Sequence, residues 1–134
     1  MLLRARKGRK TMPTQEISRS NWPEFFHGFT RGHQGWLATI EVFGSEIGAQ
    51  VEARRLSFEG IAADSGEDRI TLTVGRKPDL HLTHMVTGPT HVRLDQTEEG
   101  AKESLQIESA GETTTLVRLQ PPIFPDLTDD VILE

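Results

Sequence analysis

The alternation of apolar and polar residues changes its period near residue 35, and the part before that point predicts a helix. Four aromatic residues recur at i, i+3, i+4 and i+7, the spacing of one helical face: Trp22, Phe25, Phe26 and Phe29. Asn21 is predicted to cap this helix, with Glu24 completing a capping box. Glycines predict its end near residues 32–34. We expect the aromatic stripe to pack against the core; a docking face for a partner is the alternative.

From Trp36 onward the period is two, which is typical of strands with one buried face. Seven segments separated by turn residues show it: 36–43, 49–60, 70–74, 80–86, 90–96, 105–107 and 115–119. In the second segment the alternation of apolar and polar residues shifts by one position at Arg54 and Arg55, which predicts a bulge or a strong bend.

These elements predict a mainly β chain with one N-terminal helix, an α+β fold. The short connections favour an antiparallel meander of about six to seven strands that forms a small barrel or half-barrel. The helix would cover one opening. A parallel βαβ architecture is excluded, because no internal segment is long enough to be a crossover helix.

Residues 80–96 hold three of the five histidines and are predicted to form a hairpin around Thr87-Gly88-Pro89. In this register Val86 lies opposite Thr90. One face carries His81, Thr83, Met85, His91, Arg93 and Asp95, and the other carries Leu80, Leu82, His84, Val86, Val92 and Leu94. His84 is therefore predicted to be a hydrogen-bonded histidine among apolar neighbours.

The polar face of this hairpin supplies the candidate ligand-binding residues His81, His91, Arg93 and Asp95. In the predicted register His81 lies opposite Asp95, and a carboxylate orients an imidazole and favours its charged form. The pair could act as a general base. No metal site is predicted, because His81 and His91 lie about four strand positions apart and zinc needs three or four converging ligands. A polar sheet face without a ligand is the alternative.

Charge divides the chain into a basic leader and an acidic body. Residues 1–11 hold five of the fifteen basic residues and no acid, whereas the remainder has ten basic and twenty acidic residues, a net charge of −10. Such a body repels polyphosphate, which disfavours nucleic-acid binding by the domain. The predicted organisation is a disordered basic leader over 1–11, a single domain over 12–120 and a proline-rich acidic tail over 121–134. We interpret the leader as an extension upstream of a start at Met12.

Several chemistries are disfavoured by what the sequence lacks. The chain has no cysteine, no G-x-S-x-G motif and no glycine-rich phosphate loop, so no catalytic residue and no cofactor are predicted. No apolar run approaches the roughly 18 residues of a membrane helix. The lack of cysteine is compatible with the cytoplasm, the predicted location.

Three segments together resemble a small, uncharacterised bacterial family that is a domain of unknown function: residues 21–44, 47–64 and 81–101. The resemblance covers Met12 to about Leu119 and implies a bacterial, cytoplasmic protein, but no activity. In topology alone the chain is similar to Sm-like small barrels, which assemble into rings. It departs from them in its acidic body, its extra hairpin (103–119) and its missing glycine-asparagine signature, so RNA binding is not implied.

Three functions remain open from the sequence. The first is a non-enzymatic module that binds another protein or associates with itself as a homo-oligomer, because a β-rich chain has strand edges to cover. The second is a small-ligand-binding or hydrolytic domain that uses the 80–96 face. The third is nucleic-acid binding through the basic leader.

Overall fold

The computed structural model describes residues 14–46, 48–64, 66–76, 78–96 and 102–122. In chain order its elements are β1 (Gln15–Ile17), the 3-10 helix η2 (Arg19–Asn21), α1 (Trp22–His33), β2 (Leu37–Gly44), β3 (Gly48–Asp64), β4 (Arg69–Arg76), β5 (Leu80–Thr87), β6 (Pro89–Gln96), β7 (Glu103–Ser109) and β8 (Thr113–Gln120). The predicted basic leader (1–11) and all but two residues of the predicted tail lie outside the described residues.

The strands form one antiparallel sheet in the order β1-β6-β7-β8-β2-β3-β4-β5. Two meanders build it, one from β2 to β5 and the other from β6 to β8. They join where β2 pairs with β8, from Leu37 opposite Gln120 to Gly44 opposite Thr113. The chain passes from β5, at one end of the sheet, to β6, next to the other end, through Gly88 alone.

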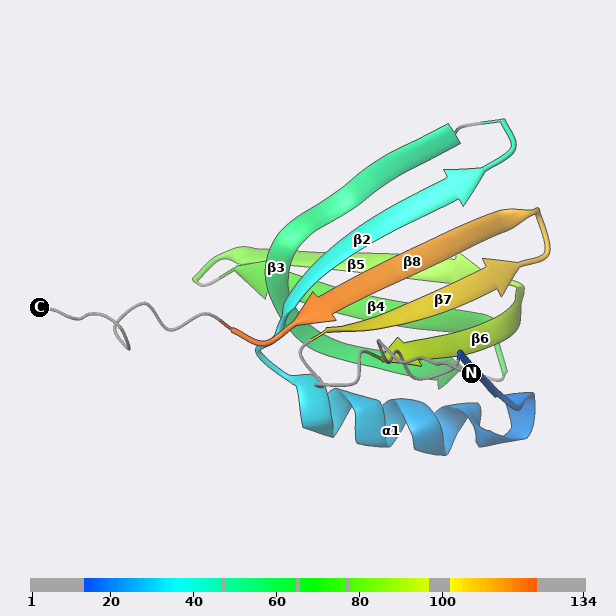
Figure 1. Cartoon of the computed structure of the whole chain (residues 1–134), viewed down its shortest axis with the longest axis horizontal. Helices are drawn as coiled ribbons and strands as arrows, with labels where there is room; N and C mark the ends of the chain where they lie inside the picture. The colour runs from blue at the N-terminus through cyan, green and yellow to red at the C-terminus, as the bar shows by residue number, and fades with distance from the viewer. Residues whose placement is uncertain (1–13, 47, 65, 77, 97–101, 123–134) are drawn as a thin grey trace, which may run out of the picture.

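The sheet curls but does not close into a barrel, because β5 and β1 stand at its two ends without pairing. The predicted mainly β fold with one helix is confirmed. The sheet has eight strands in place of about seven, since β1 adds a short strand to the outer side of β6. Helix α1 lies along the sheet next to the second half of β3, on the side opposite the β2–β3 turn (Figure 1).

The bend of β3 begins at the predicted bulge, which is confirmed. Ala53 pairs with Ile40 and Leu56 with Ala38, so the two arginines between them lie opposite the single residue Thr39, and β3 has one extra residue here. Arg55 adopts a left-handed backbone with φ of 54°, and its N–H donates to Thr39 Oγ1 at 3.1 Å. A bulge increases the local bend and twist. Beyond it β3 leaves β2 and pairs with β4.

Three of the four aromatic residues in the stripe of α1 are buried and the fourth, Phe25, is partly buried against the core, which confirms the predicted core role. Trp22, Phe26 and Phe29 are each less than a tenth exposed, and the Phe29 ring meets the ring of Phe58 on β3 edge to face at 5.9 Å. The Trp22 indole N–H donates to the carbonyl of Ile17 at 3.0 Å, which fixes the start of α1 to β1. In the part of the chain that the structure describes, no helix is long and apolar enough to cross a membrane.

The predicted capping box is wrong. The Asn21 side chain makes no capping hydrogen bond. Asn21 is instead the last residue of η2, with helical φ and ψ of −97° and −2°, and its N–H donates to the Ser18 carbonyl at 2.9 Å. A capping residue usually has an extended backbone, whereas Asn21 has the helical backbone of η2.

The predicted hairpin over 80–96 is also wrong. β5 pairs only with β4, and β6 pairs with β1 and β7. Gly88, with φ of 65°, redirects the chain, and its N–H and carbonyl bond to the Asp68 carbonyl and the Ala110 N–H, each at 2.9 Å. A tight hairpin loop needs two residues, whereas only one residue links β5 to β6. β6 therefore continues away from β5.

The predicted alternation of inward and outward side chains is confirmed for β2, β4, β7 and β8, whereas Val51 of β3 and Leu80 of β5, which the same alternation places inward, are exposed. The inward positions of β2, β4, β7 and β8 are buried: Ala38, Ile40, Val42, Ile70, Leu72, Val74, Leu105, Ile107, Thr115, Val117 and Leu119. Each large apolar side chain removed from water in this way stabilises the fold by about 1.5–3 kcal/mol. Which side chains of a strand point inward therefore does not depend on the strand with which it pairs.

Candidate functional site

The four predicted ligand-binding residues lie in two separate places. His81 stands on β5, at one end of the sheet, with its side chain 66% exposed. It pairs with Gly75 of β4, not with Asp95, and its Nδ1 lies 3.2 Å from the Glu59 carboxylate of β3. His91, Arg93 and Asp95 lie on β6, near the other end. The structure therefore does not bring His81 together with the other three.

The β6 residues face β1 and connect it to the sheet. His91 Nδ1 lies 2.7 Å from Glu16 Oε2, and Arg93 Nε lies 3.5 Å from Glu16 Oε1. The guanidinium of Arg93 also binds Glu108 of β7. Asp95 accepts a hydrogen bond from Thr14 Oγ1 at 2.9 Å. Each predicted site residue on β6 thus has a partner inside the protein.

The contacts with β6 change the electrostatic environment of the Glu16 carboxylate. Its hydrogen bond to His91, with the positive charges of His91 and Arg93, holds the pKa of Glu16 below its ordinary value. These contacts favour a structural role for the group, namely attachment of the short strand β1 to β6. Ligand binding by His81, His91, Arg93 and Asp95 stays a prediction.

His84 lies on the inner face of β5, as predicted, but it is half-buried and its imidazole forms no hydrogen bond with another described residue. Burial lowers its pKa, because an imidazolium loses hydration there, and the opposing influence of Glu52 is weaker. The predicted apolar-face position is confirmed, whereas the predicted hydrogen bond is not formed within the described residues.

Stability is expected to fall as the pH drops below the ordinary pKa of histidine. The pKa of His84 is lower in the folded state, so the unfolded chain binds more protons at acid pH and unfolding is favoured. The contribution is fully present above the unfolded pKa and is lost as the pH falls through the folded one. Urea unfolding at pH 7.5 and pH 5 should show a smaller loss for His84→Leu than for the wild type. His81→Leu, on the exposed face of β5, is the control; equal losses in all three proteins would contradict the assignment.

A buried histidine–glutamate pair lies at the end of α1, and sequence reasoning missed it. His33 Nε2 lies 2.9 Å from Glu103 Oε1, and the two side chains are only 12% and 10% exposed. His33 Nδ1 lies 2.8 Å from the Phe29 carbonyl. Since a carbonyl only accepts, Nδ1 carries a hydrogen, and the contact with Glu103 then needs a second proton on the imidazole or the carboxyl.

Aromatic rings enclose this pair. Phe29 stacks on the His33 ring at 4.0 Å, and Trp36 meets it edge to face at 4.6 Å. Gln96 Nε2 also donates to the Glu103 carboxylate at 3.2 Å. The arrangement ties α1 to the start of β7. His33 falls four residues after Phe29, which could have indicated its position, but no sequence signal connects it to a residue 70 positions away.

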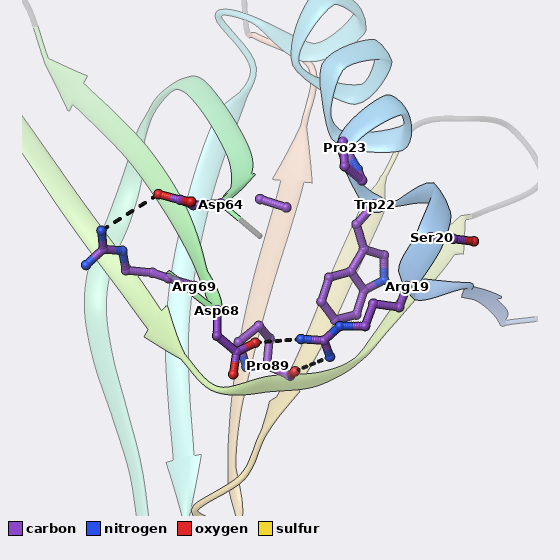
Figure 2. Close-up of a pocket in the computed structure, with 9 residues that line it drawn as sticks. Arg19, Ser20, Trp22, Pro23, Asp64, Asp68, Arg69 and Pro89 are labelled. Atoms are coloured by element: carbon purple, nitrogen blue, oxygen red, sulfur yellow. Dashed lines mark hydrogen bonds and ion pairs between the residues drawn. The ribbon is translucent and has the colours of Figure 1, made fainter. Parts of the chain in front are cut away.

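A surface cavity, here called the Trp22 cavity, opens where η2 and α1 meet the ends of β3 and β4 (Figure 2). It measures about 230 Å³ and is lined by Arg19, Ser20, Trp22, Pro23, Ala63, Asp64, Asp68, Arg69 and Pro89. Arg19 spans one side. Its guanidinium donates to Asp68 Oδ1 at 2.5 Å and to the Pro89 carbonyl at 3.0 Å, and it lies 4.6 Å from the Trp22 ring centroid.

The other candidate functional surface is the free edge of β5. Among the described residues three large hydrophobic side chains are exposed, and two of them, Leu80 and Met85, lie on this strand at 41% and 52% exposure. The third is Val51 on β3. In the described ranges no group of three or more histidine, aspartate or glutamate side chains could hold a metal ion.

Comparison with known proteins gives one match. The model of a protein family described as "Family of unknown function (DUF5335)" matches residues 13–127. No curated protein and no solved structure matches the chain.

Proposed function

Since this chain belongs to DUF5335, a family of unknown function, we propose a function from the arrangement of its own residues. The protein is a non-enzymatic module that associates with a second copy of itself by pairing their β5 strands edge to edge. A bacterial, cytoplasmic setting is part of the proposal and rests on the sequence resemblance alone.

The open edge of β5 is the observation that carries the proposal. β5 pairs with β4 along its whole length, Leu80–Thr87, and no described strand pairs with its other side. At the opposite end of the sheet, β1 covers part of β6. An unpaired strand edge presents free N–H and carbonyl groups to any other strand, and proteins usually protect such edges.

The side chains of β5 support this use of its edge. Leu80–Thr87 contains no lysine, arginine, aspartate or glutamate, the residues that commonly guard an edge. The first half of β3 is also unpaired on its outer side, but it carries Glu52, Arg54 and Arg55. β5 is therefore the unguarded edge.

A second copy of the chain is the partner that this strand fits. A two-fold axis relates two edge strands in antiparallel orientation. With Thr83 on the axis, Leu80 faces Val86 of the second copy and His81 faces its Met85, so no pair joins like charges. The rest of the domain is acidic, so two copies repel each other there. The electrostatic repulsion is lowest where the uncharged β5 strands meet.

Sedimentation velocity over a range of protein concentrations tests the proposal. We expect the wild type to reach twice the 15.0 kDa mass of the chain. Met85→Lys places a charge on the exposed face of β5 and should weaken dimerisation by at least about tenfold.

Val51→Lys is the matched control, because Val51 is similarly exposed but lies on the guarded edge of β3. It should dimerise as the wild type does, and circular dichroism should confirm that both variants fold. A wild type that stays monomeric at every concentration would overturn the proposal. Equal weakening by both substitutions would assign the contact to another surface.

A further inference from the structure

Another surface cavity, here called the bulge cavity, lies where the bulge of β3 meets β2, β8 and the start of β7. It measures about 190 Å³, and its walls include Thr39, Arg55, Lys102, Glu103, Ser104 and Arg118. Three of these residues are basic and one is acidic, whereas the Trp22 cavity has two of each in its wall. The bulge cavity is therefore a positively charged place on a chain whose net charge from residue 12 onward is −10.

The bulge in β3 is the feature that brings Arg55 to this cavity. Ala53 and Leu56 are both buried although they lie three positions apart. The two residues between them, Arg54 and Arg55, are both exposed. In a regular strand they would point to opposite faces of the sheet. Arg55 has a left-handed backbone, which is unfavourable for arginine, and backbone strain of this kind is typical of functional sites.

The pairing of the strands sets further donors beside Arg55. Arg118 of β8 lies opposite Thr39 of β2 on one side and Ser104 of β7 on the other. The bulge places Arg55 opposite the same Thr39. Directly opposite residues have Cβ atoms about 5 Å apart, so Arg55 and Arg118 flank Thr39 at a separation of about 10 Å. Two long arginine side chains at this spacing can reach one small anion between them.

The positive charge beside Thr39 is only partly balanced within the described part of the chain. The guanidinium of Arg55 pairs with no described carboxylate, since its bond to Thr39 uses the backbone N–H. Arg118 Nη1 lies 2.8 Å from Glu41 Oε1, but the side chain is 55% exposed and has further donors. The Glu103 carboxylate is nearly buried and lies against His33. An anion would therefore meet net attraction in this cavity.

The donors and the size of the cavity suit a phosphate group. A phosphate group presents three oxygens and close to two negative charges, and arginine binds such oxygens with paired N–H donors. A carboxylate offers two oxygens and one charge. At about 190 Å³ the cavity is smaller than the roughly 300–1,000 Å³ of sites for drug-sized molecules, so one such group fills it. Nucleic acid is disfavoured, because the acidic remainder of the domain repels a chain of phosphates.

We propose that the bulge cavity binds the phosphate group of a small molecule, either the free ion or a phosphate ester. Arg55 and Arg118 bind its oxygens from two sides, and the Thr39 hydroxyl donates to it between them. Lys102 adds positive charge at the start of β7. The described lining contains no residue of β5, so the site does not depend on β5 pairing.

Titration of the ¹⁵N-labelled protein, followed by NMR, tests the ligand class. The reporters are the backbone N–H resonances of Thr39, Arg55 and Ser104, at constant ionic strength and pH 7.5, where phosphate esters are dianionic. We expect inorganic phosphate or phenyl phosphate to shift them saturably, with a dissociation constant on the order of millimolar. The tighter of the two identifies the free ion or an ester as the ligand. Acetate should bind at least about threefold more weakly.

Substitutions within the bulge locate the site. Arg55→Asn should weaken phosphate binding by at least about fivefold, and asparagine tolerates the left-handed backbone of this position. Arg118→Gln should have a similar effect while keeping a donor for Glu41. Arg54→Asn is the matched control, because it removes the same charge from an exposed neighbour that is not in the described lining. It should change the dissociation constant by less than about twofold. Circular dichroism should confirm that all three variants fold.

The proposal fails if neither phosphate compound shifts the reporters, or if Arg55→Asn binds as the wild type does. Equal weakening by Arg54→Asn and Arg55→Asn would also overturn it, because the binding would then be a general attraction to positive charge. Acetate binding as tightly as phosphate would rule out the phosphate class. An oligothymidylate that binds more tightly than phenyl phosphate would replace the small molecule with nucleic acid.

Discussion

Phe26→Ala is expected to lower the free energy of unfolding by about 3–5 kcal/mol, the range for removing a buried aromatic ring. The Phe26 side chain is completely buried, and it belongs to helix α1, which packs on the sheet. Removing the ring loses the free energy of burial and leaves a cavity that the stiff sheet fills only in part. Urea unfolding followed by circular dichroism measures the change.

Phe25→Ala is the matched control, because the two residues are adjacent and their rings meet edge to face at 5.4 Å. Phe25 is only partly buried, so its loss should cost about 1–2 kcal/mol. A comparable loss in both variants would mean that the helix is held by its general hydrophobicity, not by the inward face of the stripe.

Glu103→Ala should have a similarly large effect, about 3–5 kcal/mol, because it leaves His33 Nε2 without a partner in a nearly dry site. The substitution also removes the acceptor of Gln96 Nε2. His33→Ala should be less costly than this, since Glu103 keeps its bond to Gln96. Chemical unfolding of the two single variants and the double variant forms a complete double-mutant cycle.

The expected signature is strong non-additivity, with the double variant costing less than the sum of the single ones. His81→Ala provides the comparison, because its contact with Glu59 is exposed and should be worth only about 0–1 kcal/mol. Additive losses in the cycle would show that His33 and Glu103 act independently and would contradict a coupled pair.

The elements of this fold could be predicted because their signals are local. The stripe from Trp22 to Phe29 and the alternation in β4 depend on which side chains face the core. The slip at Arg54 and Arg55 is equally local, and it appears as the bulge in β3. None of these signals depends on the identity of the neighbouring strand.

Strand partners and the sites between elements could not be predicted from the sequence in this way. The sequence around Gly88 contains turn residues, but only the bonds of this residue to Asp68 and Ala110 decide that the chain does not reverse there. The pair of His33 and Glu103 joins residues 70 positions apart. The Trp22 cavity likewise combines η2 with the ends of β3 and β4, which parity in one strand cannot reveal.

The joining of two meanders through β2 and β8 has a consequence for folding kinetics. Within each meander neighbouring strands follow one another along the chain, so their pairing encloses short loops. Pairing residues 37–44 with 113–120 encloses a far longer loop, and its entropic cost must be met before the new contacts form. We expect docking of β8 on β2 to limit the refolding rate, with the two meanders forming first as separate units.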